Sequence, residues 1–258
     1  MKTAIVTGAY GAIGKAIAEG IAIEKDFRVV LVGRGQQQLT DAVRVVSSRT
    51  NNPNVEGALV DLSSLASIRA FADTFLDPLH VLVNNAATAP RQRLLSVEGI
   101  EMQWAVNVMG YFRMTQLFTP HLMKANGARV VNVASYWAGG LDFNDPEFKR
   151  RPYNNDVAYR QSKQANRMMS AAFSERLMGF QITVNACHPG DVNSKLSNSL
   201  GFGGHENPVQ GAETPVWLAL SREVEGVTGK YFEHRNDLPC AFMNDSEGVL
   251  RLYSILNR

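Results

Sequence analysis

Cysteine is nearly absent from this chain, which has only two among its 258 residues, Cys187 and Cys240. Two thiols provide neither a disulfide framework nor the ligand cluster of a structural metal site. The histidines form no ligand-spaced group either, so no metal is expected. These absences favour two buried or incidental thiols in a reducing compartment, and therefore a cytoplasmic protein.

Long hydrophobic runs are also absent. Runs such as Val29–Val32 and Val81–Val83 are strand-sized, far below the roughly 18 to 20 residues that cross a bilayer. Met1 leads directly into Ala4–Val6 and glycines, without the apolar segment of a signal peptide. The formal net charge of +2 is too small to indicate a nucleic-acid partner. We therefore expect no integral membrane segment and no nucleic acid.

What the chain does contain is a regular alternation of short apolar runs and helical patterns. Continuous Val, Ile and Leu are typical of parallel strands buried on both faces. The predicted strands are Thr3–Val6, Val29–Val32, Gly57–Val60, Val81–Val83, Val130–Val133 and Ile182–Ala186. The predicted helices are Ala12–Glu24, Gln36–Arg49, Ser63–Phe75, Val97–Met109, Tyr111–Lys124 and the helix that carries Tyr159. This order predicts one doubly wound α/β domain over residues 1–258.

Two stretches interrupt the alternation. Gly139–Asp156 is rich in Asp, Asn, Pro and Arg and precedes the Tyr159 helix. Lys195–Gly211 places Leu196, Leu200 and Phe202 among Ser, Asn and Gly residues. A polar loop that carries apolar side chains is typical of a mobile substrate lid, and a merely irregular connection is the alternative.

A glycine-rich turn follows the first predicted strand. Gly8, Gly11 and Gly14 lie in Thr7–Gly14, and a helix begins at once. Glycines allow a tight turn and close approach of the backbone to a pyrophosphate, whose charge then lies at a helix N-terminus. The strand before the turn and the helix after it favour dinucleotide binding over a plain connection.

The residue after the second strand indicates which dinucleotide binds. An acidic residue there would bind the ribose 2′-hydroxyl, but this chain has Arg34, whose guanidinium can pair with a 2′-phosphate. NADP(H) is therefore expected rather than NAD. Asp61 and Leu62 follow the third strand, where they can meet the adenine ring. Asp61 can equally cap the helix that begins near Ser63.

A tyrosine and a lysine four residues apart, Tyr159 and Lys163, project from one face of a helix. Together with the glycine turn, Asn84–Ala87, Ser135 and the segment His188–Ser194, this pair resembles the short-chain dehydrogenase/reductase family. The resemblance implies a Rossmann fold with a mostly parallel seven-stranded sheet. The sequence departs from the family pattern at Ala12, Ala87 and Ser194. Ser194 keeps the hydroxyl of the usual threonine.

The resemblance also assigns site residues. The implied catalytic set is Asn107, Ser135, Tyr159 and Lys163. The implied cofactor contacts are Gly8, Tyr10, Gly11, Ala12, Ile13, Gly14, Arg34, Asp61, Leu62, Asn85, Ala86, Ala87, Tyr159, Lys163, Pro189, Gly190, Val192 and Ser194. Ser135 and Tyr159 lie 24 positions apart, because Gly139–Asp156 is inserted between them. The length of this insertion is similar to that found in the retinol dehydrogenase-like branch. It also resembles, less well, the insertion of protochlorophyllide reductases.

The implied reaction is hydride transfer between nicotinamide and a carbonyl or alcohol carbon. Tyr159 would exchange the proton, Ser135 would polarise the carbonyl oxygen, and Asn107 would help to hold a proton-relaying water. Lys163 would hold the nicotinamide ribose and favour the phenolate. A cation about 4 Å away contributes up to about 4 kcal/mol, or about three pKa units, before any burial penalty. Trp137, Phe143 and Tyr153 are candidates for the substrate pocket, with core packing as the alternative.

Three functions remain open at this point. The leading one is an NADPH-dependent reductase of an apolar aldehyde or ketone, because Leu196, Leu200, Phe202 and Trp217 are expected near the lid. The others are an NADPH-sensing regulator without turnover and a protochlorophyllide-type double-bond reductase. Classical family members often form dimers or tetramers, and the insertion before Tyr159 can obstruct that packing, so a monomer or a homodimer is expected.

Overall fold

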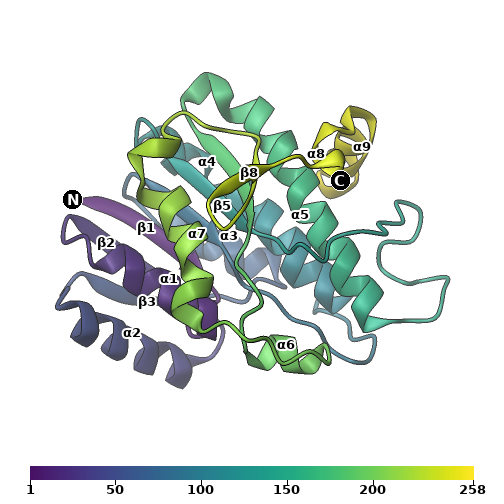
Figure 1. The fold of residues 1–258 in the computed structure, drawn as a ribbon, viewed down its shortest axis with the longest axis horizontal. Helices are drawn as coiled ribbons and strands as arrows, with labels where there is room; N and C mark the ends of the chain where they lie inside the picture. The colour runs from purple at the N-terminus through teal and green to yellow at the C-terminus, as the bar shows by residue number, and fades with distance from the viewer.

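The computed structural model describes all residues from 1 to 258. Its sheet has eight strands in the order β3-β2-β1-β4-β5-β6-β7-β8, and only β8 runs antiparallel to its neighbour. The strands are β1 (Lys2–Thr7), β2 (Phe27–Gly33), β3 (Val55–Leu59), β4 (Val81–Asn84), β5 (Arg129–Val133), β6 (Thr183–His188), β7 (Tyr231–Glu233) and β8 (Asn236–Leu238). The predicted doubly wound α/β architecture is confirmed, and Figure 1 shows helices in front of the sheet and behind it.

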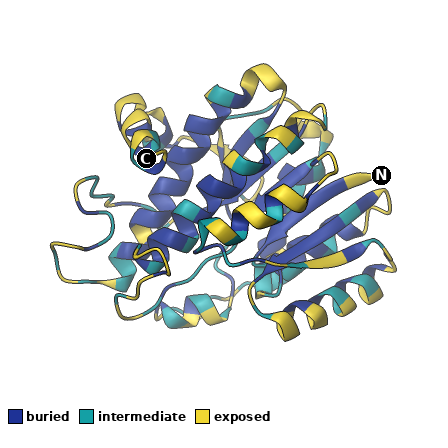
Figure 2. Ribbon diagram, turned by 180° about the vertical axis from the view of Figure 1, so that it is seen from behind, coloured by how far each residue is buried: buried dark blue, intermediate teal, exposed yellow.

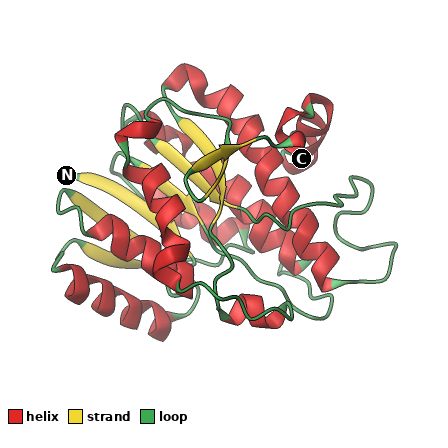
Figure 3. Cartoon of the chain, in the orientation of Figure 1, coloured by secondary structure: helices red, strands yellow, loops and turns green.

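Helices cover both faces of this sheet. They are α1 (Ala12–Ala22), α2 (Gln36–Thr50), α3 (Leu65–Thr74), α4 (Gly110–Met123), α5 (Asn155–Leu177), α6 (Lys195–Ser199), α7 (Pro208–Leu220), α8 (Ala241–Asn244) and α9 (Ser246–Leu256). One apolar layer packs α1, α2 and α7 against the sheet, and the other packs α3, α4, α5 and α9 against the opposite face. Figure 3 shows the helices packed around the strands of the sheet.

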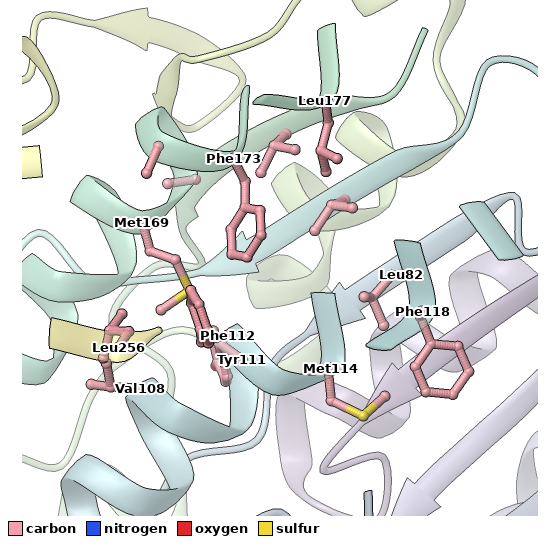
Figure 4. Packing of buried hydrophobic residues seen from close by; sticks show 14 of the residues in the cluster. Leu82, Val108, Tyr111, Phe112, Met114, Phe118, Met169, Phe173, Leu177 and Leu256 are labelled. Carbon is pink, nitrogen blue, oxygen red and sulfur yellow. The ribbon is translucent and has the colours of Figure 1, made fainter. Parts of the chain in front are cut away.

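The central strands and α5 form the interior of the molecule. Strands β1, β4 and β5 are almost entirely buried, as their continuous Val, Ile and Leu composition predicts. Figure 2 shows the same for most of α5. In the layer between α4 and α5, the rings of Phe112 and Phe173 lie 5.3 Å apart beside Met169 (Figure 4). This packing fixes α5 against the sheet, and α5 carries Tyr159 and Lys163.

The hairpin of β7 and β8 gives the sheet one strand more than the seven expected. Its turn residues, His234 and Arg235, both have positive φ angles, of 47° and 63°. Two consecutive residues of this kind match the right-handed twist of the flanking strands in a two-residue turn. Strand β8 has only three residues, all exposed, so no apolar run in the sequence reveals it.

The predicted helix Val97–Met109 is wrong at its start. Leu95 and Glu101 pair in an isolated antiparallel bridge, so the chain forms a turn there instead. Helical structure begins at Met102, passes through a π-helical turn at Trp104–Met109 and continues without a break into α4. A π turn inserts one extra residue into the helix and is often found at functional sites. Asn107 lies within it.

The two stretches that interrupt the alternation differ in secondary structure. Gly139–Asp156 has no helix or strand before Asn154 caps α5 with its side chain, which accepts from the backbone N–H of Val157. Lys195–Gly211 is more ordered than a loop, because it contains α6 and the first residues of α7. Both cysteines are free and buried, as expected. No helix combines the length and apolar character needed to span a membrane.

Candidate active site at the carboxyl ends of the strands

The glycine turn lies at the carboxyl end of β1, directly beside β4. Gly8 has a φ of +64°, and a Cβ on it would lie 2.7 Å from the Cα of Ala86. A Cβ on Gly14 would lie 2.5 Å from the side-chain nitrogen of Asn85. Both positions therefore require glycine. No side chain caps the N-terminus of α1, so its first backbone N–H groups lie at the turn, as an anion site requires.

Thr7 ties the glycine turn to the end of β4. Its hydroxyl accepts hydrogen bonds from the backbone N–H of Asn85 at 2.8 Å and of Ala86 at 3.1 Å. The Asn85 side chain in turn donates to the Thr7 carbonyl at 2.9 Å. The Asn85 amide thus maintains the shape of the site. Thr7 was not among the predicted site residues, although its place before the first glycine is the signal that could have found it.

The residues expected at the adenosine end lie around the carboxyl ends of β2 and β3. The ring of Tyr10 packs against Gly33, where any side chain would collide with it. Arg34 follows as an exposed side chain. The Asp61 carboxylate accepts from the backbone N–H of Ser63 at 2.9 Å.

Asp61 does not cap α3, because Ser64 is the capping residue. The backbone N–H and one carboxylate oxygen of Asp61 instead form hydrogen bonds that shape the turn before that helix. Leu62 is buried and packs against Gly110 at the start of α4. Of the two residues expected beside the adenine ring, only Asp61 is therefore partly exposed.

Tyr159, Lys163 and Ser135 meet where β5 ends against α5. Lys163 is 2% exposed, and its ammonium donates to the carbonyl of Val133 at 2.8 Å. The Lys163 nitrogen lies 5.6 Å from the centre of the Tyr159 ring. The Ser135 hydroxyl accepts from the backbone N–H of Trp137 at 3.1 Å. These three side chains are brought together as the family resemblance implies.

Burial is the main cause of the pKa shifts of Tyr159 and Lys163. It raises the pKa of Tyr159 to about 12, an effect that hydrogen bonding to Ser135 partly offsets. It lowers the pKa of Lys163 to about 7. Loss of hydration disfavours the charged form of both groups. The net shift of the Tyr159 pKa is upward because burial is its largest cause, and the effect expected of Lys163 before that penalty stays a prediction.

Asn107 connects the π-helical turn to α5 and to the end of β4. Its side-chain oxygen accepts from the backbone N–H of Thr88 at 2.9 Å, and its nitrogen donates to the Thr88 carbonyl at 3.0 Å. The same nitrogen donates to the Ser162 hydroxyl at 3.1 Å. The Asn107 carbonyl accepts from Asn166 at 2.7 Å. Asn107 thus holds α5 in place beside Tyr159, with its side chain fully engaged.

The segment after β6 completes the edge of the site. Gly190 has a φ of +99°, and a Cβ there would collide with the Glu206 carboxylate. Val192 is buried and pairs with Glu206 in a parallel bridge. The Ser194 hydroxyl accepts from the backbone N–H of Ser197 at 3.1 Å and so caps α6. This cap fixes the start of α6.

An apolar cluster covers Tyr159. Leu200 and Ala89 are buried against the tyrosine, and Trp137, Leu196 and Phe202 pack around them. The rings of Trp137 and Phe202 meet edge to face at 5.2 Å. Three of the four apolar residues expected near the lid therefore gather over the catalytic tyrosine candidate.

Two of the aromatic residues considered for the pocket, Phe143 and Tyr153, lie elsewhere, and so does Trp217, which was expected near the lid. Trp217 packs on Phe232 and donates to Glu223 at 2.8 Å, on the α7 side of the sheet. Phe143 lies under the guanidinium of Arg251 on α9. The Tyr153 hydroxyl is held between Gln103 and the Pro90 carbonyl. The core-packing alternative therefore holds for Phe143, which packs against the core, whereas Tyr153 is held by hydrogen bonds.

Arg167 is a residue of the site that the sequence motifs did not indicate. It is buried on α5, one turn after Lys163, and donates to the Ser135 carbonyl at 2.5 Å. It also donates to the Tyr231 hydroxyl at 2.7 Å and stacks on that ring at 3.6 Å. Tyr231 donates in turn to Glu233. The signal was available, because residues 159, 163 and 167 repeat at helical spacing.

Comparison with known proteins agrees with this geometry. A family model described as short chain dehydrogenase matches residues 2–201. Retinol dehydrogenase 13 from Mus musculus is 34% identical over 274 residues, covering 98% of this chain and 82% of the relative. A crystal structure of an uncharacterized protein from Mycobacterium Paratuberculosis superposes with a TM-score of 0.84 at 25% identity, covering 100% of this chain and 92% of that one. The Pseudomonas aeruginosa RhlG/NADP active-site complex has a TM-score of 0.71 at 26% identity, covering 90% and 93%.

Proposed function

The chain belongs to the short-chain dehydrogenase family, on its retinol dehydrogenase-like branch, and from this premise we propose that it is an oxidoreductase that uses NADPH to reduce an apolar aldehyde or ketone. The observation that carries the proposal is the position of Tyr159, which is buried beside Lys163 and beneath an apolar cluster. A phenol with a pKa of about 12 is protonated at neutral pH, and reduction requires a proton donor.

The residues at the glycine turn fit a nicotinamide dinucleotide. Gly8 and Gly14 pack too closely against Ala86 and Asn85 for any side chain, which gives the tight turn and the close helix packing of a dinucleotide-binding fold. The Tyr10 ring lies on Gly33 beside the exposed Arg34, which we assign to a ribose 2′-phosphate. The RhlG structure is an NADP complex of a related fold, which supports this choice.

The proton-transfer step follows from this chain's own residues. Bound NADPH supplies the hydride that adds to the carbonyl carbon. Tyr159 donates its phenolic proton to the carbonyl oxygen, so that the two transfers convert the carbonyl to an alcohol. The Ser135 hydroxyl donates a hydrogen bond to the same oxygen and polarises it. Lys163 lies beside the phenol, and its positive charge favours the phenolate that remains.

A substrate panel tests the proposal. Aldehydes and ketones of increasing apolar size are reduced under NADPH, and the loss of NADPH absorbance is followed. We expect turnover that increases as the apolar group grows, because the cluster over Tyr159 offers no charged group to a substrate. NADPH binding without turnover on any member of the panel would favour the sensing function instead.

Tyr159→Phe separates catalysis from binding. The variant keeps the ring but loses the proton donor, so turnover should fall by about a hundredfold or more, as expected for loss of general acid catalysis. NADPH affinity, measured by fluorescence titration, should change by no more than about fivefold, since a single neutral hydrogen bond contributes about 1 kcal/mol. Turnover that persists in the variant would show that another group donates the proton.

A further inference from the structure

A cavity lies between the inserted segment 139–156 and α9. Its volume is about 490 Å³, within the range of small-molecule sites. The residues that line it are Phe143, Asn144, Arg150, Arg251, Ser254, Ile255 and Arg258, and we call it the arginine pocket. None of them belongs to the site around Tyr159. Figures 1 and 2 place α9 and the inserted segment at one end of the molecule, apart from α6.

The three arginines of this pocket have no acidic partner, because none of them takes part in an ion pair. Arg251 donates only to the neutral Asn144 side chain at 2.8 Å and lies over the Phe143 ring at 4.8 Å. Three exposed guanidiniums therefore converge on one cavity with their charges unneutralised. Guanidinium groups match the geometry of phosphate oxygens through paired N–H donors.

The acidic residues nearby are already engaged. Asp145 accepts from the backbone N–H groups of Lys149 at 2.6 Å and of Arg150 at 3.1 Å. These hydrogen bonds lower the pKa of its carboxyl and keep it ionised. Glu147 pairs with Lys149 at 2.8 Å and accepts from the backbone N–H of Glu101 at 3.1 Å. Neither carboxylate forms an ion pair with an arginine of the pocket, since Asp145 pairs with Arg151 and Glu147 with Lys149.

We propose that the arginine pocket binds an organic phosphate. A phosphate monoester carries close to two negative charges at neutral pH, which suits several unpaired guanidiniums. Phe143 and Ile255 provide apolar surface for the organic part. The ligand is either a soluble phosphate ester or the phosphate headgroup of a lipid, since both present the same chemistry to the arginines.

Calorimetric titration with phenyl phosphate tests the proposal. The dinucleotide site is first saturated with whichever nicotinamide nucleotide binds more tightly, so that phosphate cannot enter there. Low ionic strength limits screening of the exposed charges. The double variant Arg150→Gln/Arg251→Gln should weaken binding by about tenfold or more, because it removes two charged donors. The control Arg69→Gln/Arg222→Gln removes two exposed arginines elsewhere and should change affinity by less than about twofold.

Vesicle flotation distinguishes the two sources of phosphate. The same proteins are mixed with phosphatidylcholine vesicles that contain phosphatidic acid or lack it. Binding of phenyl phosphate that the double variant loses supports a soluble ester. Flotation with phosphatidic acid that the double variant loses supports a lipid headgroup. If the wild type binds neither probe, or if the double variant binds as well as the wild type, the proposal is overturned.

Discussion

In our proposal, the choice of nucleotide depends on Arg34. This residue is exposed at the end of β2, where a carboxylate would instead repel a 2′-phosphate. Arg34→Asp should therefore lower kcat/KM with NADPH by about a hundredfold and leave or improve that with NADH, since it replaces a charge-assisted contact with repulsion. The measurement is kcat/KM with both nucleotides for wild type and variant. A variant that still prefers NADPH would show that another residue recognises the phosphate.

Arg167 is a positioning residue, since it reaches Ser135 only through the Ser135 carbonyl. Arg167→Met should lower kcat by about tenfold, because a lost hydrogen bond to a charged donor is worth about 1.5 to 3 kcal/mol. KM for the nucleotide should stay nearly constant. Arg167→Lys keeps the charge and should restore part of kcat. The matched control is Arg176→Met, also on α5, whose guanidinium stacks on Tyr253 away from Ser135.

If Arg167→Met and Arg176→Met lower stability and kcat alike, Arg167 serves only the fold. Chemical denaturation of both variants supplies that comparison. The hydrogen-bond partners of Arg167 could not be predicted from the sequence. These partners, Ser135 and Tyr231, are 32 and 64 positions away, and only the assembled sheet brings them together. The spacing of Tyr159 and Lys163, by contrast, is local and could be interpreted from the helix alone.

At the scale of elements, α6 and the glycines after it hold the apolar cluster over Tyr159. Gly201 and Gly204 have φ angles of +85° and +69°, and a Cβ on Gly204 would lie 2.6 Å from the Asp191 carbonyl. This turn directs Leu200 and Phe202 onto the site. The polar composition of Lys195–Gly211 predicted a lid region, but α6 itself was missed because five residues are too few for a periodic pattern.

Removal of one side chain from the apolar cluster tests the role of this cluster. Phe202→Ala should lower kcat/KM for bulky apolar carbonyls by about tenfold, since burial of an aromatic side chain contributes about 1.5 to 3 kcal/mol. Reduction of a small aldehyde should change little. Phe180→Ala, which truncates an exposed phenylalanine after α5, is the control. A uniform loss across substrates of all sizes would mean that Phe202 supports the fold rather than substrate choice.

For the whole molecule, the order of strands and helices could be predicted because buried parallel strands leave continuous apolar runs in the sequence. β8 could not, because its three residues are exposed and its pairing depends on the turn at His234. The protonation states of Tyr159 and Lys163 in the site could not be predicted either. The pKa values of Tyr159 and Lys163 depend on burial by α5, α4 and the sheet together, which spacing along one helix does not report.

The buried ammonium of Lys163 makes the stability of the nucleotide-free protein depend on pH. Its pKa is about 7 in the folded protein, against an ordinary value of 10.5 that applies to the unfolded chain. Between these values the unfolded chain binds a proton that the folded protein has lost. The free energy of unfolding should therefore rise with pH across this window, by about 1.4 kcal/mol per pH unit at most. Above about pH 10, deprotonation of unfolded tyrosine opposes the gain, because burial keeps Tyr159 protonated.

Lys163→Met removes the titrating group and keeps a chain of similar length. Urea denaturation at about pH 7 and about pH 9.5 should show a larger increase in unfolding free energy for the wild type than for the variant. Other groups that titrate in this window are common to both proteins, so the difference between the two increases isolates Lys163. If the increases are equal, the lysine keeps its proton in the folded protein. Its ammonium would then be stabilised by the Val133 carbonyl and the ring of Tyr111 more strongly than burial opposes it.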